Sequence, residues 1–129
     1  MRLTLDFGKL SRVAEIATGC VPVVIQDVDT KVVLLVGYTN EEAMKVAFAE
    51  RMLVLWSTSR GRLWRKGAAS GNAYELVEAR VNCEQNSLLY LVRPKMKDGG
   101  ICHVVSGDGK PYTSCYYRKI NLNTLDLET

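Results

Sequence analysis

Three cysteines and the single histidine, all in the second half of the chain, are its most chemically active residues. The cysteines are Cys83, Cys102 and Cys115, and His103 directly follows the second of them. Thiolates are soft ligands that select zinc, and three protein ligands leave a fourth position for water. These residue types predict a zinc site of the catalytic form.

The spacing of the cysteines decides how such a site could be built. They lie 19 and 13 residues apart, unlike the paired hooks of a compact zinc ribbon, so the side chains could meet only through tertiary or quaternary structure. Spacing alone leaves open the alternative of buried free cysteines that act as small apolar residues. His103 could bind the metal, transfer protons or be hydrogen-bonded in a wall of the core. Its position beside Cys102 favours proton transfer or support of the metal ligands. Cys20 has no charged neighbour, and we expect it in the core.

A basic stretch in the middle of the chain is a second candidate site. Residues 60–66 hold four cations and no acid. Arginine forks and hydroxyl groups suit phosphate, and tryptophan can stack on a base. A solvated basic strand face is the plainer alternative. The candidate phosphate- or substrate-binding residues are Ser57, Ser59, Arg60, Arg62, Trp64, Lys66, Ser70 and Gly71.

Length and composition limit the class of protein. The chain has 129 residues, of which 47% are hydrophobic and 24% charged, and this predicts a single globular domain. A net charge of +3 gives no reason to expect nucleic acid, and no apolar run is long enough to span a membrane. The first residues include acids and no sustained apolar stretch, so we expect a cytoplasmic protein whose cysteines serve metal binding or catalysis.

Hydrophobic periodicity predicts mostly strands. We expect hairpins from 21–26 with 32–38, from 52–57 with 63–66, and from 74–82 with 88–92. A helix is predicted after Thr39 or Asn40, with Met44, Ala47 and Phe48 toward the core. We divide the chain into an N-terminal arm (1–19, partly helical), a domain (20–118) and a C-terminal tail (119–129).

Taken together, several motifs resemble those of the phosphoribosyl-AMP cyclohydrolase family. The resemblance runs from about residue 20 to residue 118, and its most specific part is the block from Trp56 to Gly67. The other matching segments are Pro22 to Asp27, Val33 to Ala43, Ser70 to Asn72, Cys83, Cys102 with His103, and Ser114 to Arg118.

The resemblance implies a compact, mostly β single domain of the α+β class, with a folded mixed sheet and few short helices, that forms a homodimer. It implies a zinc site shared between subunits, with Cys83 from one chain and Cys102 and Cys115 from the other. The implied reaction is hydrolysis of the N1–C6 bond of phosphoribosyl-AMP in histidine biosynthesis. Zinc would activate the water and His103 would transfer protons, while the basic stretch would hold the phosphates of this nucleotide substrate.

The chain departs from the family pattern at the expected active site. Three aspartates that bind magnesium in the family read Asn82, Glu84 and Asn86 here, which predicts a weaker or absent magnesium site. The connection between His103 and Cys115 is lengthened by Ser106 to Thr113. Two alternatives therefore stay open: a divergent paralogue that hydrolyses another nucleotide or heterocycle, and a non-catalytic, zinc-stabilised dimer that binds a nucleotide.

Overall fold

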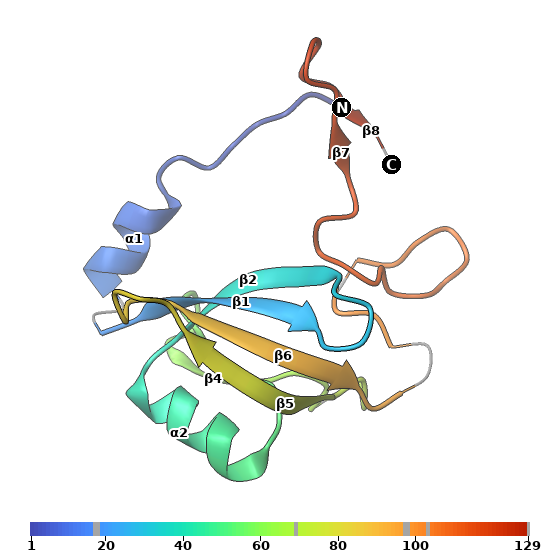
Figure 1. The fold of residues 1–129 in the computed structure, drawn as a ribbon. Coiled ribbons are helices and arrows are strands. Elements are labelled where there is room, and N and C mark those ends of the chain that lie inside the picture. Colours follow the sequence, from blue (N-terminus) through green and yellow to red (C-terminus); the bar gives the residue numbers. More distant parts are fainter. Residues whose placement is uncertain (17–18, 69, 97–98, 103, 129) are drawn as a thin grey trace.

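The computed structural model describes residues 1–16, 19–68, 70–96, 99–102 and 104–128 (Figure 1). The three predicted hairpins and the predicted helix are all confirmed. The elements in chain order are α1 (Lys9–Ile16), β1 (Val21–Asp27), β2 (Val33–Thr39), α2 (Glu41–Glu50), β3 (Val54–Ser57), β4 (Arg62–Arg65), β5 (Tyr74–Val81), β6 (Leu88–Pro94), β7 (Lys119–Ile120) and β8 (Leu127–Glu128).

The main sheet has four strands in the order β2-β1-β6-β5. β1 pairs antiparallel with β2, and β5 pairs antiparallel with β6, because each pair is joined by a short turn. The two hairpins join through a parallel pairing of β1 with β6. This mixed sheet, with two helices among mostly strands, confirms the α+β class.

Helix α2 begins at a capped residue and packs on the sheet. The Asn40 side chain accepts a hydrogen bond from the Ala43 N–H at 2.9 Å, as expected of an N-cap. Ala43 and Ala47 are fully buried and Phe48 contacts the core, whereas Met44 is only half-buried. The core face is therefore centred on the alanines and not on Met44.

The hydrophobic core lies on one face of the sheet, under α2 and the β3–β4 hairpin. Fully buried side chains from the sheet, such as Ile25, Tyr90 and Val92, meet Leu53 and Val54 of the hairpin layer there. Each such burial stabilises the fold by about 1.5–3 kcal/mol. On the opposite face of the sheet, the part of the chain that the structure describes forms no such layer and leaves apolar side chains such as Val36 exposed.

The two ends of the sheet are the feature that positions the site. We name the two ends after the terminal residues of β1. Strands β2 and β5 begin at the Asp27 end, where β1 and β6 finish. Strands β1 and β6 begin at the Val21 end, where β2 and β5 finish. β1 has seven residues, so the two ends are roughly 20 Å apart. Short turns that leave opposite ends therefore lie far apart within one chain.

The arm and the tail associate with each other beyond the sheet (Figure 1). The Leu3 N–H donates to the Leu125 carbonyl at 2.9 Å, and the Leu127 N–H donates to the Met1 carbonyl at 2.8 Å. The sequence did not predict this pairing. Of the helices in the described residues, neither has the length and apolar character needed to cross a membrane.

Candidate active site

The segment that leads to Cys102 is held by side chains just before and at the start of β5. The Nδ2 atom of Asn72 donates to the Gly100 carbonyl at 2.6 Å, and the Tyr74 hydroxyl donates to the Gly99 carbonyl at 3.1 Å. A Cβ atom on Gly100 would lie 2.4 Å from the Tyr112 carbonyl oxygen, so only glycine fits. These contacts fix Cys102 at the Asp27 end.

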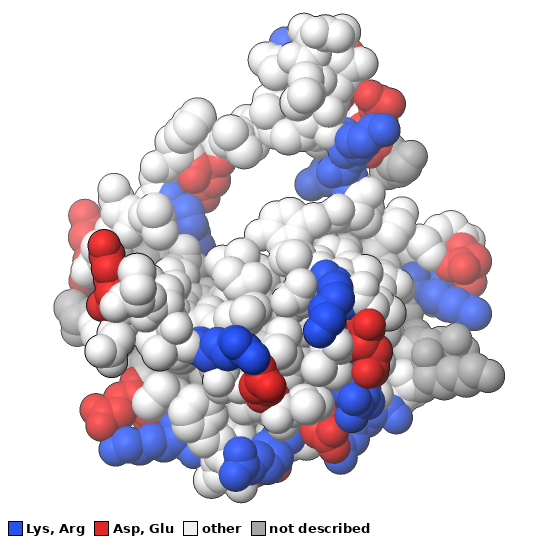
Figure 2. All heavy atoms as spheres, in the orientation of Figure 1, with Lys and Arg blue, Asp and Glu red and all other residues white. Residues whose placement is uncertain are grey.

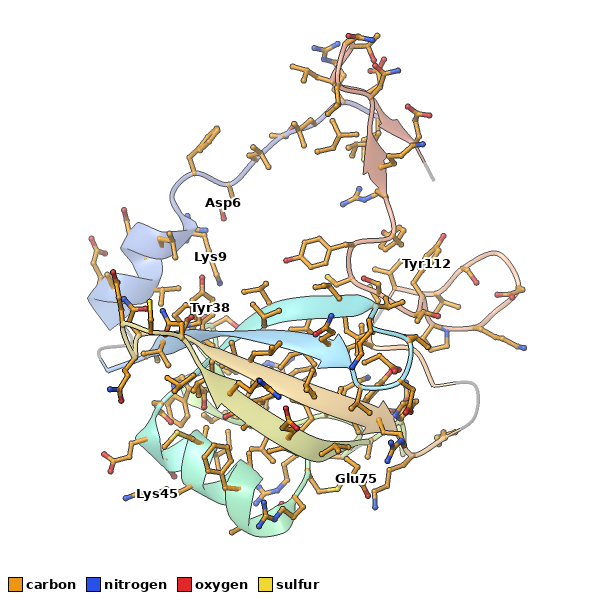
Figure 3. The ribbon with its side chains drawn as sticks, in the orientation of Figure 1. Asp6, Lys9, Tyr38, Lys45, Glu75 and Tyr112 are labelled. Carbon is orange, nitrogen blue, oxygen red and sulfur yellow. The ribbon has the colours of Figure 1, made fainter. Side chains whose placement is uncertain are left out.

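The lengthened connection, Ser106 to Thr113, forms a hairpin that brings Cys115 back toward Cys102. The Ser106 N–H donates to the Lys110 carbonyl at 2.8 Å, and the Cys102 N–H donates to the Tyr112 carbonyl at 3.2 Å. Figure 3 shows Tyr112 close to the Asp27 end of the sheet. The Cys115 N–H then donates to the Leu34 carbonyl of β2 at 2.7 Å.

The thiols of Cys102 and Cys115 lie side by side as a result. Cys102 is buried and Cys115 is exposed. Partial burial of the Cys115 thiol raises its pKa, and the charge of the nearby Cys102 thiol raises it further. Two adjacent thiols fit a zinc ion, because a soft cation between them stabilises both as thiolates.

A cavity of about 410 Å³ opens beside Cys102. It is lined by Lys66, Ser70, Asn72, Met96, Gly99, Cys102 and Pro111. Burial lowers the pKa of the Lys66 ammonium group, while the nearby Cys102 thiol acts in the opposite direction. The cavity thus combines an ammonium group, a hydroxyl and a thiol, a set that suits an anionic ligand near a metal.

Sequence reasoning placed Lys66 and Ser70 among the binding residues but missed Asn72. Asn72 is 7% exposed, and its Oδ1 atom has no hydrogen-bond partner among the described residues. Gly71 precedes it with a φ of +76°, where glycine is favoured. A polar residue in a Ser-Gly-Asn loop resembles an exposed turn residue, so the sequence held no clear signal of its burial.

The third cysteine lies at the Val21 end of the sheet. Cys83 is exposed in the β5–β6 turn, next to the edge strand farthest from β2. The neighbouring side chains of Asn82, Glu84 and Asn86 hydrogen-bond one another. Oδ1 of Asn82, Oδ1 of Asn86 and one carboxylate oxygen of Glu84 accept hydrogen bonds within the turn. Only one of the three side chains can be charged, so this donor set does not fit magnesium.

Four of the candidate phosphate-binding residues also lie at the Val21 end, namely Ser57, Ser59, Arg60 and Arg62. The β3–β4 turn is closed by the Gly61 N–H, which donates to the Ser57 carbonyl at 2.8 Å. Lys9, which points from α1 toward this end in Figure 3, donates to Thr58 of the same turn at 3.4 Å. Arg62 lies at the turn end of β4, roughly 13 Å of strand away from Lys66.

The residues of the basic stretch differ in their exposure and in their ion pairs. Arg65 forms an ion pair with Glu50 at 2.7 Å, and Trp64 is 37% exposed on the same strand. Arg60 and Arg62 are exposed at the turn. Figure 2 shows Lys and Arg side chains interspersed with Asp and Glu on the visible face.

One chain therefore splits the predicted site into two halves. The Val21 end holds Ser57, Ser59, Arg60, Arg62 and Cys83; the Asp27 end holds Lys66, Ser70, Gly71, Cys102 and Cys115. Among the described residues of one chain, no three His, Cys, Asp or Glu side chains gather around a common point. His103 lies outside the described residues.

Fold and site define a small α+β protein in which Cys102 lines a cavity that also holds an ammonium group and a hydroxyl. The family profile described as phosphoribosyl-AMP cyclohydrolase matches residues 35–117. The chain is 43% identical over 102 residues to the phosphoribosyl-AMP cyclohydrolase of Archaeoglobus fulgidus, covering 79% of this chain and 86% of that one. It is 39% identical over 109 residues to that of Chloroherpeton thalassium, covering 84% and 71%. The chain belongs to the phosphoribosyl-AMP cyclohydrolase family.

Proposed function

We propose that this chain hydrolyses the adenine ring of phosphoribosyl-AMP between N1 and C6, as a homodimer with two zinc sites. Cys102 and Cys115 of one copy and Cys83 of the partner subunit would hold each zinc ion. The observation that carries the proposal is the separation of the two halves, because Cys83 and the thiol pair lie at opposite ends of the sheet. A second copy supplies the missing half without any change of fold.

The surface of the chain supports a dimer. The open face of the main sheet exposes Val33 and Val36, which are 42% and 45% accessible, beside a groove that also contains Val24 and Leu89. Apolar side chains gathered on one face favour a protein contact. Cys83 is exposed at one end of this sheet, where a partner could reach it.

The residues that bind the phosphate groups of the substrate would also come from both copies. Lys66 and Ser70 line the cavity beside Cys102, so they would bind one phosphate near the reacting ring. Arg60 and Arg62 would join from the partner subunit together with its Cys83, since all three lie at the Val21 end. Arginine at that position can grip two phosphate oxygens at once.

Zinc held by these thiolates supplies Lewis-acid activation of water. In the overall reaction a hydroxyl group is added to C6, the N1–C6 bond breaks, and a proton goes to N1. His103 directly follows Cys102 in the sequence and would carry this proton. Asn72 and Tyr74 would keep the Cys102 segment in place during turnover through Gly100 and Gly99.

Ring opening of phosphoribosyl-AMP changes its ultraviolet absorbance, so turnover by the zinc-loaded protein can be followed directly. We expect His103→Ala to slow turnover at least about 100-fold while zinc stays bound. Cys83→Ser should lose both zinc and turnover, whereas Cys20→Ser, the matched control, should keep both. Full zinc occupancy without any ring opening would contradict the proposed reaction and favour a nucleotide-binding dimer.

A further inference from the structure

The β5–β6 turn, residues 82–87, is closed by its own side chains. The Oδ1 atom of Asn82 accepts hydrogen bonds from the N–H groups of Asn86 and Ser87, each at 2.9 Å. The Nδ2 atom of Asn82 donates to Oδ1 of Asn86 at 2.6 Å, and Nδ2 of Asn86 donates to the Glu84 carboxylate at 3.1 Å. The turn that carries Cys83 is thus complete without a bound ion.

The backbone of the turn depends on the same residue. The Asn82 N–H donates to the Ser87 carbonyl at 3.2 Å, and the Gln85 N–H donates to the Asn82 carbonyl at 3.0 Å. Gln85 adopts a φ of +55°, which allows the chain to reverse direction beside Cys83. Asn82 therefore joins both sides of the turn through its backbone and its side chain.

These contacts compete with a hard cation for the same atoms. Magnesium demands octahedral oxygen coordination and is bound mainly through carboxylates. Oδ1 of Asn82 already accepts two hydrogen bonds, and an amide NH₂ group faces Oδ1 of Asn86. A cation would have to break the contact between Asn82 and Asn86 and would gain the charge of Glu84 alone.

We propose that the amide pair of Asn82 and Asn86 takes the structural place of a divalent cation, so that this chain holds the Cys83 turn without magnesium. Aspartates at both positions would put three carboxylates into five consecutive residues, and their mutual repulsion would require a cation. The amides remove two of those charges and add hydrogen-bond donors. This inference concerns the turn alone and does not rest on the proposed reaction.

The test compares the wild-type chain with the Asn82→Asp/Asn86→Asp double variant, using magnesium chloride alone as the probe. In metal-depleted buffer with zinc loaded, the wild-type unfolding midpoint should not change as Mg²⁺ rises to millimolar concentration. The double variant should unfold at a lower temperature without Mg²⁺ and regain stability saturably with it. Calorimetry should show Mg²⁺ binding at least about tenfold tighter than to the wild type. Asn123→Asp, in an exposed turn of the tail, controls for added charge.

A saturable rise of the wild-type midpoint with Mg²⁺, or measurable Mg²⁺ binding at the turn, would overturn the proposal. A folded double variant that gains no response to Mg²⁺ would overturn it too. If the double variant does not fold, Asn86→Asp alone keeps the bonds that Asn82 accepts and gives the same test. No arm of the experiment uses turnover, so its outcome is separate from that of the proposed reaction.

Discussion

Tyr74 offers a direct test of how the Asp27 end is held together, through the dependence of stability on pH. Its side chain is 1% exposed and its hydroxyl donates to the Gly99 carbonyl at 3.1 Å. Burial, with a smaller contribution from the charge of Asp27, raises the pKa of Tyr74 from 10.0 to about 12. The fold therefore favours the protonated hydroxyl, and ionisation of Tyr74 works against folding.

The direction and size of the effect follow from linkage. Below pH 10 the hydroxyl is protonated in both states, so its contribution to stability is fully present. As pH rises from 10 to 12 the unfolded chain releases the proton first, and stability falls. A difference of two pKa units corresponds to about 2.7 kcal/mol, of which about 2 kcal/mol is lost by pH 12.

Tyr74→Phe separates this contribution from the rest of the protein. At pH 7 the variant should be less stable by about 1 kcal/mol, because the Gly99 carbonyl loses a hydrogen bond. At pH 12 the order should reverse, and the variant should be more stable by about 1 kcal/mol. The measurement is the free energy of unfolding in denaturant at intervals from pH 7 to pH 12.

Tyr116 provides the matched control. Tyr116 is 61% exposed, so Tyr116→Phe should follow the wild-type pH profile throughout. If the profiles of wild type and Tyr74→Phe run parallel from pH 9 to pH 12, then the Tyr74 hydroxyl is not held neutral by burial. The described anchoring of the Cys102 segment through Gly99 would then be wrong.

Two further predictions concern the backbone around the site. Gly100→Ala should destabilise the fold by about 1–3 kcal/mol in denaturant unfolding, because the new Cβ atom would lie 2.4 Å from the Tyr112 carbonyl oxygen. Gly107→Ala is the control and should leave stability unchanged, because no atom lies within 4 Å of its new Cβ atom. Asn40→Ala should cost about 1 kcal/mol in the same assay, since the cap on Ala43 is lost; an unchanged midpoint would show that the cap contributes nothing.

Local patterns explain which parts of the fold could be predicted. The hairpins β1–β2, β3–β4 and β5–β6 follow from alternating apolar residues that flank short polar turns, all within about twenty residues of chain. The parallel pairing of β1 with β6 joins residues more than sixty positions apart, such as Val23 and Leu88, and leaves no local signature. The family resemblance implied a mixed sheet but did not say which two strands pair in parallel.

In the candidate site, too, residue types could be predicted from the sequence but long-range contacts could not. Residue type alone pointed to Cys102 and Cys115, but their contact depends on the hairpin of residues 106–113 returning the chain to the edge of β2. Asn72 was missed because its loop reads as polar, although its amide holds Gly100. Arg62 begins β4 and Lys66 directly follows it, so the two side chains lie at opposite ends of a short strand. Their closeness in sequence gave no indication of this separation.

The central claim is that each zinc site is completed by Cys83 of a second copy, and mixing two defective variants tests it directly. Cys83→Ser and Cys102→Ser, each expected to lack zinc sites, are unfolded together, refolded as a mixture and loaded with zinc. Mixed dimers would contain one intact site and one doubly damaged site, so the mixture should regain about a quarter of wild-type zinc and turnover. If the mixture binds no more zinc than either variant alone, the site is not shared between copies.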